Sequence, residues 1–239
     1  KLREDKEKGY QGQWRLEGSK QHTGNPYPTH GLGPVCQYMD INRGDRLEYL
    51  TSVSSGQFGL SLLAAEKYGK GSPEAKMAYR LGDMNTTVIK TYRGRTILVQ
   101  HDTTSPRPYS RLNLISGTQG ILSDYPLRVA LAPRSHEWLS DKELAELKAK
   151  HVHPLWDKQG ESAKKMGGHG GMDYLMDLRL CHCLQNGLPL DISVYDTALW
   201  SSIVELSERS VLRNGGSVEI PDFTRGGWKS ADPLGIVTV

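Results

Sequence analysis

The sequence predicts an α+β fold in which a large, open and mainly antiparallel β-sheet carries helices on one face. Two observations lead to this prediction. Runs rich in β-branched residues follow one another through short connections between residues 46 and 131, as in consecutive hairpins. Helical patterns with capping signals gather between residues 140 and 213. We find no convincing boundary and expect one domain over residues 1–239.

Several segments have the composition of strands. The clearest pair is joined by Arg93-Gly94-Arg95, where two runs containing valine, isoleucine and threonine meet at a tight turn. A second pair is expected to meet at Gly117. In chain order, the expected strands cover residues 46–54, 85–92, 95–103, 109–116, 117–125 and 128–131.

The strongest helix signals lie toward the end of the chain. Ser140 and Glu143 have the spacing of a capping box, and Gly187 is placed to end a later helix. One face of that later helix should be buried, and it carries Met172, Leu175, Met176, Leu180 and Cys183. The expected helices cover residues 33–41, 60–68 (helix or loop), 140–150, 172–186 and, after a cap at Asp191 or Ser193, the stretch to residue 213. Residues 1–34 and 151–168 are expected to be irregular.

The composition is that of an ordinary globular chain. Of its 239 residues, 24% are charged and 37% are hydrophobic, which is sufficient for a substantial core. The net charge of +3 comes from basic residues interleaved with acidic ones, and this argues against a nucleic-acid-binding face. No apolar run approaches the ~20 residues of a membrane span. Three cysteines do not indicate a disulfide framework.

One stretch, Gly24-Asn25-Pro26-Tyr27-Pro28-Thr29-His30, carries side chains suited to an active site. Each proline fixes φ at about −65° and disfavours helical backbone in the residue before it. We therefore expect a stiff, extended segment that presents a phenol, a hydroxyl and an imidazole for proton transfer. The alternative is a structural loop whose His30 caps the next helix, and residue types alone leave both interpretations open.

Other kinds of site have weaker support. The glycine cluster at residues 167–171 could hold an anion, but it follows no strand, and a tight turn with His169 pointing into a cleft is the better interpretation. Cys181, His182 and Cys183 diverge around a helix, so we expect no metal site there. There is no Gly-x-Ser-x-Gly elbow, and no carboxylate pair for glycoside hydrolysis stands out.

A set of polar side chains remains after these exclusions. Arginine and tyrosine suit recognition of hydroxyl and acyl groups, and histidine and tyrosine suit proton transfer. The set consists of Arg15, Tyr27, Thr29, His30, Tyr109 and His169. For Tyr109, an aromatic residue at the start of a strand is the simpler interpretation.

Three segments of the chain resemble one known family. They are Gln13-Trp14-Arg15, the run from Asn25 through Tyr27-Pro28-Thr29-His30 to Pro34, and Gly168-His169-Gly170-Gly171-Met172-Asp173-Tyr174-Leu175-Met176. Together they resemble the NAD-dependent α-N-acetylgalactosaminidases of glycoside hydrolase family 109. The Tyr-Pro-Thr-His segment is the most specific part, whereas Gly-His-Gly-Gly is shared with the wider superfamily of glucose-fructose oxidoreductase and inositol dehydrogenase-like proteins.

The resemblance implies a two-domain protein with an N-terminal Rossmann domain and a C-terminal domain built on a large open sheet. This chain resembles only the second part. We therefore expect an upstream NAD-binding domain as a partner and an inactive isolated chain. The resemblance also implies a substrate that carries N-acetylgalactosamine, and the open sheet face suggests a homo-oligomer.

The resemblance further implies an oxidation–elimination chemistry with NAD as cofactor. The sugar would be oxidised at C3, its C2 proton removed, the glycoside eliminated, water added and the ketone reduced again. The sugar-binding residues would be Arg15, Tyr27, Pro28, Thr29, His30 and Tyr109. His30 and Tyr27 would be catalytic, with Tyr27 also beside the nicotinamide, and His169 is a further candidate in the cleft.

Two other functions stay open at this point. A sugar oxidoreductase on the same scaffold would release NADH, although the Asp-x-x-x-His pair common in such dehydrogenases is not found in this chain. The second open function is that of a non-catalytic oligomerisation module.

Overall fold

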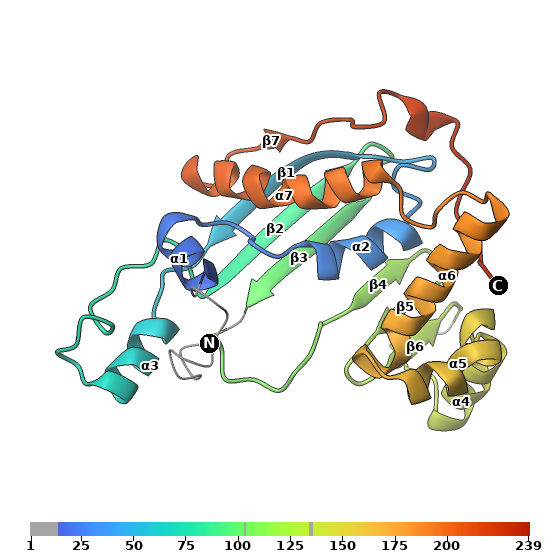
Figure 1. Ribbon diagram of the computed structural model, residues 1–239, viewed down its shortest axis with the longest axis horizontal. Coiled ribbons are helices and arrows are strands. Elements are labelled where there is room, and N and C mark those ends of the chain that lie inside the picture. Colours follow the sequence, from blue (N-terminus) through green and yellow to red (C-terminus); the bar gives the residue numbers. More distant parts are fainter. Residues whose placement is uncertain (1–13, 103, 134–135) are drawn as a thin grey trace. The chain divides into compact units, whose positions relative to one another are not determined.

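The computed structural model describes residues 14–102, 104–133 and 136–239, and it confirms an α+β fold built on antiparallel sheets (Figure 1). The chain divides into two compact units. Unit 1 consists of the described part of Lys1–Pro106 together with Ile192–Pro233, and unit 2 consists of the described part of Arg107–Asp191 together with Leu234–Val239. The single functional domain expected from the sequence stays a prediction.

A four-stranded antiparallel sheet forms the centre of unit 1, in the order β3-β2-β1-β7. Its strands are β1 (Leu47–Ser54), β2 (Met84–Thr91), β3 (Thr96–Asp102) and β7 (Val218–Glu219). The hairpin predicted around Arg93-Gly94-Arg95 is confirmed, because β2 and β3 pair from Met84↔Asp102 to Lys90↔Thr96.

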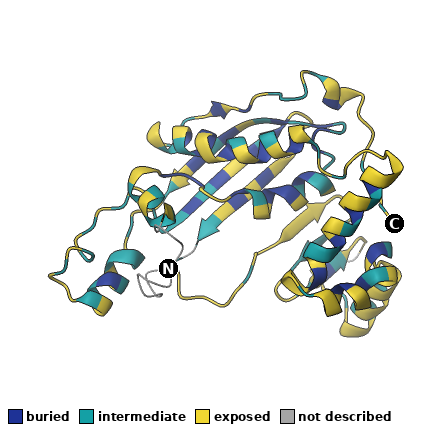
Figure 2. Cartoon of the chain, viewed as in Figure 1, coloured by how far each residue is buried: buried dark blue, intermediate teal, exposed yellow. Residues whose placement is uncertain are grey.

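Helices α2 (Thr29–Tyr38) and α7 (Val194–Leu212) cover one face of this sheet (Figure 1). Buried and exposed residues alternate along β1, β2 and β3, as a half-covered sheet requires (Figure 2). Leu199, Ile203 and Leu206 lie on the buried face of α7. The core between helices and sheet contains Leu32, Cys36, Leu47, Leu50, Ile89, Ile97, Val99, Leu199, Trp200, Ile203 and Leu206.

The covered face also carries buried polar residues. Asn85 donates from Nδ2 to Ser52 Oγ at 2.9 Å, and Ser52 Oγ lies 2.9 Å from Thr87 Oγ1. The backbone N–H of Ser52 donates to Ser210 Oγ of α7 at 2.8 Å. Because these groups bond to one another, polar side chains are tolerated beside the apolar core.

Unit 2 contains a three-stranded antiparallel sheet and three longer helices. The sheet order is β4-β5-β6, with β4 (Leu114–Gly117), β5 (Gly120–Ser123) and β6 (Arg128–Leu131). The helices are α4 (Asp141–Lys150), α5 (Pro154–Met166) and α6 (Met172–Asn186). The predicted capping box of Ser140 and Glu143 is present. A small core of Leu155, Ala163 and Leu175 packs against Val237 and Val239.

The strand predictions need two corrections. The strands belong to two sheets instead of one large sheet. The pair expected at residues 109–116 and 117–125 is shorter: β4 begins at Leu114, and Gly117 pairs with Gly120, so the turn lies at Thr118 and Gln119.

The expectation of irregular structure in residues 151–168 is wrong, because α5 occupies most of that stretch. Pro154 stands in its first turn, and the His153 side chain accepts a hydrogen bond from the Leu155 N–H at 3.2 Å. Helix α1 (Trp14–Gln21) was also not predicted, and none of its residues is buried. It is held by tertiary bonds, since the N–H groups of Arg80 and Leu81 donate to Ser19 O at 3.0 and 3.1 Å.

The buried face of α6 differs from the predicted one. Leu175 and Cys183 are buried as expected, but Met172, Met176 and Leu180 are exposed. The stripe between Leu175 and Cys183 is completed by Arg179, which is 8% exposed and donates to Asp191 Oδ1 at 2.7 Å. A paired arginine therefore takes the place that an apolar pattern assigns to leucine or methionine.

Asp45 connects the segment after α2 to the β2–β3 turn. Its carboxylate is fully buried and accepts hydrogen bonds from Arg95 at 2.7 Å and from the Arg46 and Arg93 N–H groups at 2.8 and 3.0 Å. Burial raises the pKa of Asp45, but hydrogen bonds from Arg95, Thr91 and these N–H groups outweigh it, and the pKa lies below its ordinary value.

Unit 1 should therefore lose stability in acid. Because the folded-state pKa of Asp45 lies below the unfolded value of about 3.9, its contribution is complete above that pH and is lost as the pH falls through the folded pKa. We expect Asp45→Asn to lower the unfolding temperature at pH 7 and to reduce its decline below about pH 4. Circular dichroism melting curves across the pH series measure both effects.

Asp177→Asn, on an exposed part of α6, is the control and should leave the profile unchanged. An Asp45→Asn profile parallel to that of the unmodified chain would contradict this account of the carboxylate.

Candidate functional site

One turn of α7 holds the segment that precedes α2. Ser207 Oγ accepts a hydrogen bond from the Asn25 N–H at 2.8 Å, and the Glu208 carboxylate accepts one from the Thr23 N–H at 3.1 Å. Gly24 lies between them at φ 80°, and a Cβ placed on it would be 2.6 Å from the Glu208 nitrogen. Glycine alone permits so close an approach in this conformation.

The prolines were expected to keep this segment extended, but the backbone is already helical at Pro28. Pro28 has φ −75° and ψ −26°, and its carbonyl accepts hydrogen bonds from the Gly31 and Leu32 N–H groups, so α2 begins at Thr29 instead of residue 33. The fixed φ of proline suits the start of a helix as well as extended backbone. His30 therefore lies inside the first helical turn and does not cap the helix.

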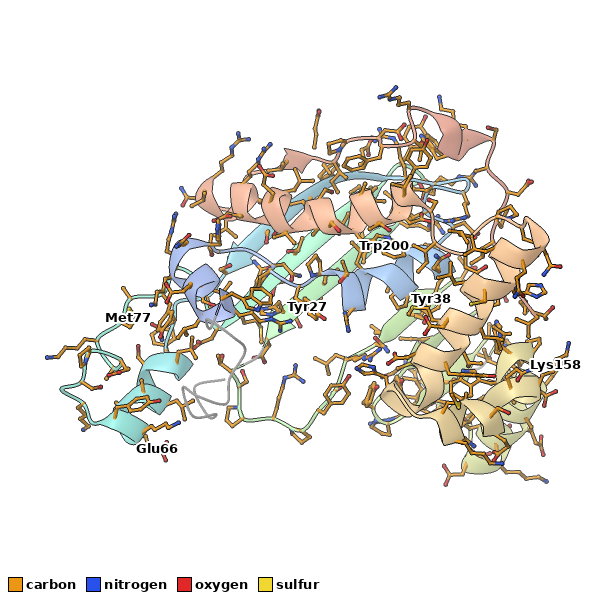
Figure 3. All side chains as sticks on the ribbon, in the orientation of Figure 1. Tyr27, Tyr38, Glu66, Met77, Lys158 and Trp200 are labelled. Atoms are coloured by element: carbon orange, nitrogen blue, oxygen red, sulfur yellow. The ribbon has the colours of Figure 1, made fainter. Side chains whose placement is uncertain are left out.

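Arg15, Tyr27 and His30 converge on one exposed surface of unit 1. The Tyr27 and His30 rings are 4.6 Å apart and tilted by 31°, and the Tyr27 hydroxyl lies 3.4 Å from His30 Nε2. The Arg15 guanidinium carbon lies 5.3 Å from the centre of the Tyr27 ring and 4.9 Å from that of Trp14. Figure 3 shows Tyr27 at the start of α2, where its side chain remains 45% exposed.

The surroundings of this trio keep it in place without covering it. Asn25 Oδ1 accepts a hydrogen bond from the Tyr27 N–H at 3.1 Å, and the next residue, Pro28, is buried. Farther along α2, a Cβ placed on Gly33 would lie 3.4 Å from the Trp200 ring of α7. A guanidinium, a phenol and an imidazole are thus presented together, which suits binding of hydroxyl and acyl oxygens and transfer of a proton.

His101, at the end of β3, was not among the residues predicted from the sequence. It belongs to the face of β3 on which Ile97 and Val99 are buried, and its Nδ1 atom is buried without a hydrogen-bond partner among the described residues. Burial lowers the pKa of His101; Asp102 opposes this shift and Arg15 adds to it. The alternation of side chains along the strand was the signal that could have placed it.

Tyr109 and His169 belong to unit 2. The Tyr109 hydroxyl accepts a hydrogen bond from Arg111 Nε at 2.9 Å, and its exposed ring lies edge-on to Tyr125 with centroids 5.9 Å apart. Tyr109 lies outside β4, so it does not start a strand. His169 Nδ1 lies 2.9 Å from an Asp173 carboxylate oxygen. The sugar contact expected of Tyr109 and the cleft position expected of His169 stay predictions, and Gln13 lies outside the described residues.

Other chemistries find little support in the described structure. Burial raises the pKa of the Cys36 thiol to about 12, with Trp200 opposing and Asp196 adding to the shift, so this cysteine is not an activated nucleophile. No group of three or more histidine, cysteine or acidic residues suited to a metal ion occurs among the described residues. Over the same residues, no helix is long and apolar enough to cross a membrane.

Nearly the whole chain is similar to known proteins. The family described as glycosyl hydrolase 109, C-terminal domain, matches residues 2–230. A glycosyl hydrolase family 109 protein of Shewanella amazonensis is 53% identical over 230 residues, which cover 95% of this chain and 50% of that protein. Family 109 protein 2 of Phocaeicola vulgatus is 52% identical over 227 residues, covering 95% and 55%. The chain therefore spans about half the length of the curated relatives it matches.

Among solved structures, the fold is similar to that of a levoglucosan dehydrogenase in its apo form. The TM-score is 0.56 at 15% sequence identity, with 88% of this chain and 54% of that chain covered. At this identity the likeness shows a shared fold.

The contact between Gly24 and α7 can be tested by substitution. We expect Gly24→Ala to lower the free energy of unfolding by roughly 1–3 kcal/mol, because alanine at φ 80° is strained and its Cβ would collide with the backbone of Glu208. Chemical denaturation measures this change. Gly18→Ala is the matched control: it lies in α1 with no atom within 4 Å of its Cβ position, and alanine there should leave stability equal or slightly higher. Equal effects of both substitutions would contradict the close approach.

Proposed function

The chain belongs to glycosyl hydrolase family 109, and on this premise we propose that it is the sugar-binding half of an NAD-dependent glycosidase. The substrate we propose is a glycan or glycoside with a terminal α-linked N-acetylgalactosamine. The observation that supports this proposal is the convergence of Arg15, Tyr27 and His30 on one exposed surface. These are three of the positions that the family resemblance assigns to the sugar.

The residues present suit one end of the cofactor. Tyr27 offers a partly exposed ring and a hydroxyl, which fit contact with a nicotinamide. The sequence has no Gly-x-Gly-x-x-Gly motif, so we propose that an upstream Rossmann domain holds the pyrophosphate. When bound, NAD supplies reversible acceptance of a hydride from the sugar ring.

Each residue of the trio has a distinct role in the proposal. The Arg15 guanidinium can donate hydrogen bonds to hydroxyl or acetamido oxygens of the sugar. His30 Nε2 and the Tyr27 hydroxyl are neighbours at 3.4 Å, and this pair can take a proton from the sugar ring and return it. Pro28 and Thr29 line the sugar beside them. We propose the same substrate-contact role for Tyr109, with His169 as a further candidate.

An assay of the full-length protein tests the function. With an aryl α-N-acetylgalactosaminide, we expect release of the aglycone without net formation of NADH. His30→Ala should lower kcat by about 10²–10⁴-fold because a positioned proton-transfer group is lost. His151→Gln, at an exposed position after α4, should keep wild-type activity.

The results also separate the alternatives. Net NADH without aglycone release would replace the glycosidase by a sugar oxidoreductase. Absence of both products would favour a non-catalytic module. Full turnover of His30→Ala would remove this residue from the mechanism.

We also propose that a second copy of the protein covers the open face of the unit 1 sheet. Val53, Val88 and Leu98 are exposed there, at 60%, 43% and 62%. Lys90 and Glu219 flank Tyr49 in one cross-strand row, so this face carries both charges and can complement itself across a two-fold axis.

Light scattering of the full-length protein after gel filtration tests this interface. The double variant Val53→Lys, Leu98→Lys should convert a dimer to a monomer, because like charges would meet in an apolar contact. Leu62→Lys, on helix α3 (Gly59–Tyr68) and 71% exposed, should leave the mass unchanged. A wild-type monomer, or a double variant of unchanged mass, would contradict the proposal.

A further inference from the structure

His101 lies where the elements of the candidate site meet. Helix α2 runs antiparallel to β3: the Arg95 guanidinium donates to Met39 O just after the end of α2, while Gly31 in its first turn lies against Val99. Because side chains alternate along a strand, His101 follows Val99 on the same face, two residues beyond the point covered by the start of α2. The segment that carries Tyr27 enters α2 at this end.

The polar neighbours of His101 explain why its imidazole is incompletely bonded. Asn85 is its cross-strand partner, but the Asn85 amide donates to Ser52 and Ser54 and accepts from Thr87. His101 Nδ1 is buried and has no partner among the described residues. A water molecule or a ligand can satisfy a buried polar atom that has no protein partner.

The charge state of the imidazole defines what it can bind. Burial lowers the pKa of His101, Asp102 raises it, and Arg15 lowers it again, with a net shift below the ordinary value. The uncharged ring has one nitrogen that donates and one that accepts. Next to a guanidinium, which only donates, such a group complements a hydroxyl or an acetamido group of a sugar.

We infer that His101 is a further sugar-binding residue of this site, where its imidazole Nδ1 hydrogen-bonds a hydroxyl or the acetamido group of the N-acetylhexosamine. This inference rests on the proposed function. With His101, the proposed site includes strand β3 in addition to helices α1 and α2.

Two substitutions of His101 in the full-length protein separate binding from packing. Phenylalanine retains a ring and removes both nitrogens, whereas asparagine places an amide near the position of Nδ1. We expect His101→Phe to raise KM for the aryl glycoside about tenfold to hundredfold, with kcat changed less than about threefold. His101→Asn should recover most of this loss. His151→Phe is the exposed control and should match the wild type.

A second readout is the ¹⁵N spectrum of histidine-labelled wild-type protein, with the His101 signal assigned from its absence in His101→Asn. Addition of N-acetylgalactosamine should shift that signal. An unshifted signal, or a His101→Phe enzyme with wild-type KM, would overturn the inference. If His101→Phe fails to fold, the titration decides alone. If the wild type cleaves no glycoside, the proposed function fails, while the titration still decides whether His101 binds the sugar.

Discussion

The candidate site depends on the attachment of residues 23–25 to one turn of α7. Ser207 and Glu208 accept the N–H groups of Asn25 and Thr23, and Gly24 allows the two backbones to approach. Helix α7 is itself packed on β1 and bonded to it through Ser210. The core of unit 1 therefore fixes the position of Tyr27. A flexible loop could not hold a phenol and an imidazole at a set distance.

The covered face of the unit 1 sheet has an apolar part, which stabilises the fold, and a polar part, which lies toward the candidate site. Its apolar part, with Leu50, Ile89 and Ile97, supplies the burial that stabilises unit 1. Its polar part, with Asn85 and His101, would be unfavourable in a purely structural core. Most of these groups satisfy one another, and the exception at His101 lies beside the proposed sugar surface. A buried polar atom without a protein partner calls for a specific explanation, such as a water molecule or a ligand.

Most of the fold was predictable because it follows local rules. The β2–β3 hairpin, the capping boxes at Ser140 and Ser193 and the glycine stop at Gly187 depend on neighbours within a few residues. Two of the failures have the opposite cause. Helix α1 buries no residue, and the buried stripe of α6 includes an arginine whose partner lies twelve residues away. No periodicity reveals such a tertiary bond.

The sequence by itself determined the fold class and most element boundaries, and it placed Arg15 and the segment Tyr27-Pro28-Thr29-His30 among the candidates for the site. Tertiary structure alone decided that Arg15 of α1 contacts the Tyr27 ring and that His101, at the end of β3, shares the strand face on which Ile97 and Val99 are buried. The physical reason is range: proline and glycine act on adjacent backbone, whereas contact between α1, α2 and β3 arises only when the hairpin and α7 have packed. Gly24 combines local and long-range effects. Its positive φ is a local property that glycine permits, and this conformation is needed for the close contact with Glu208 of α7.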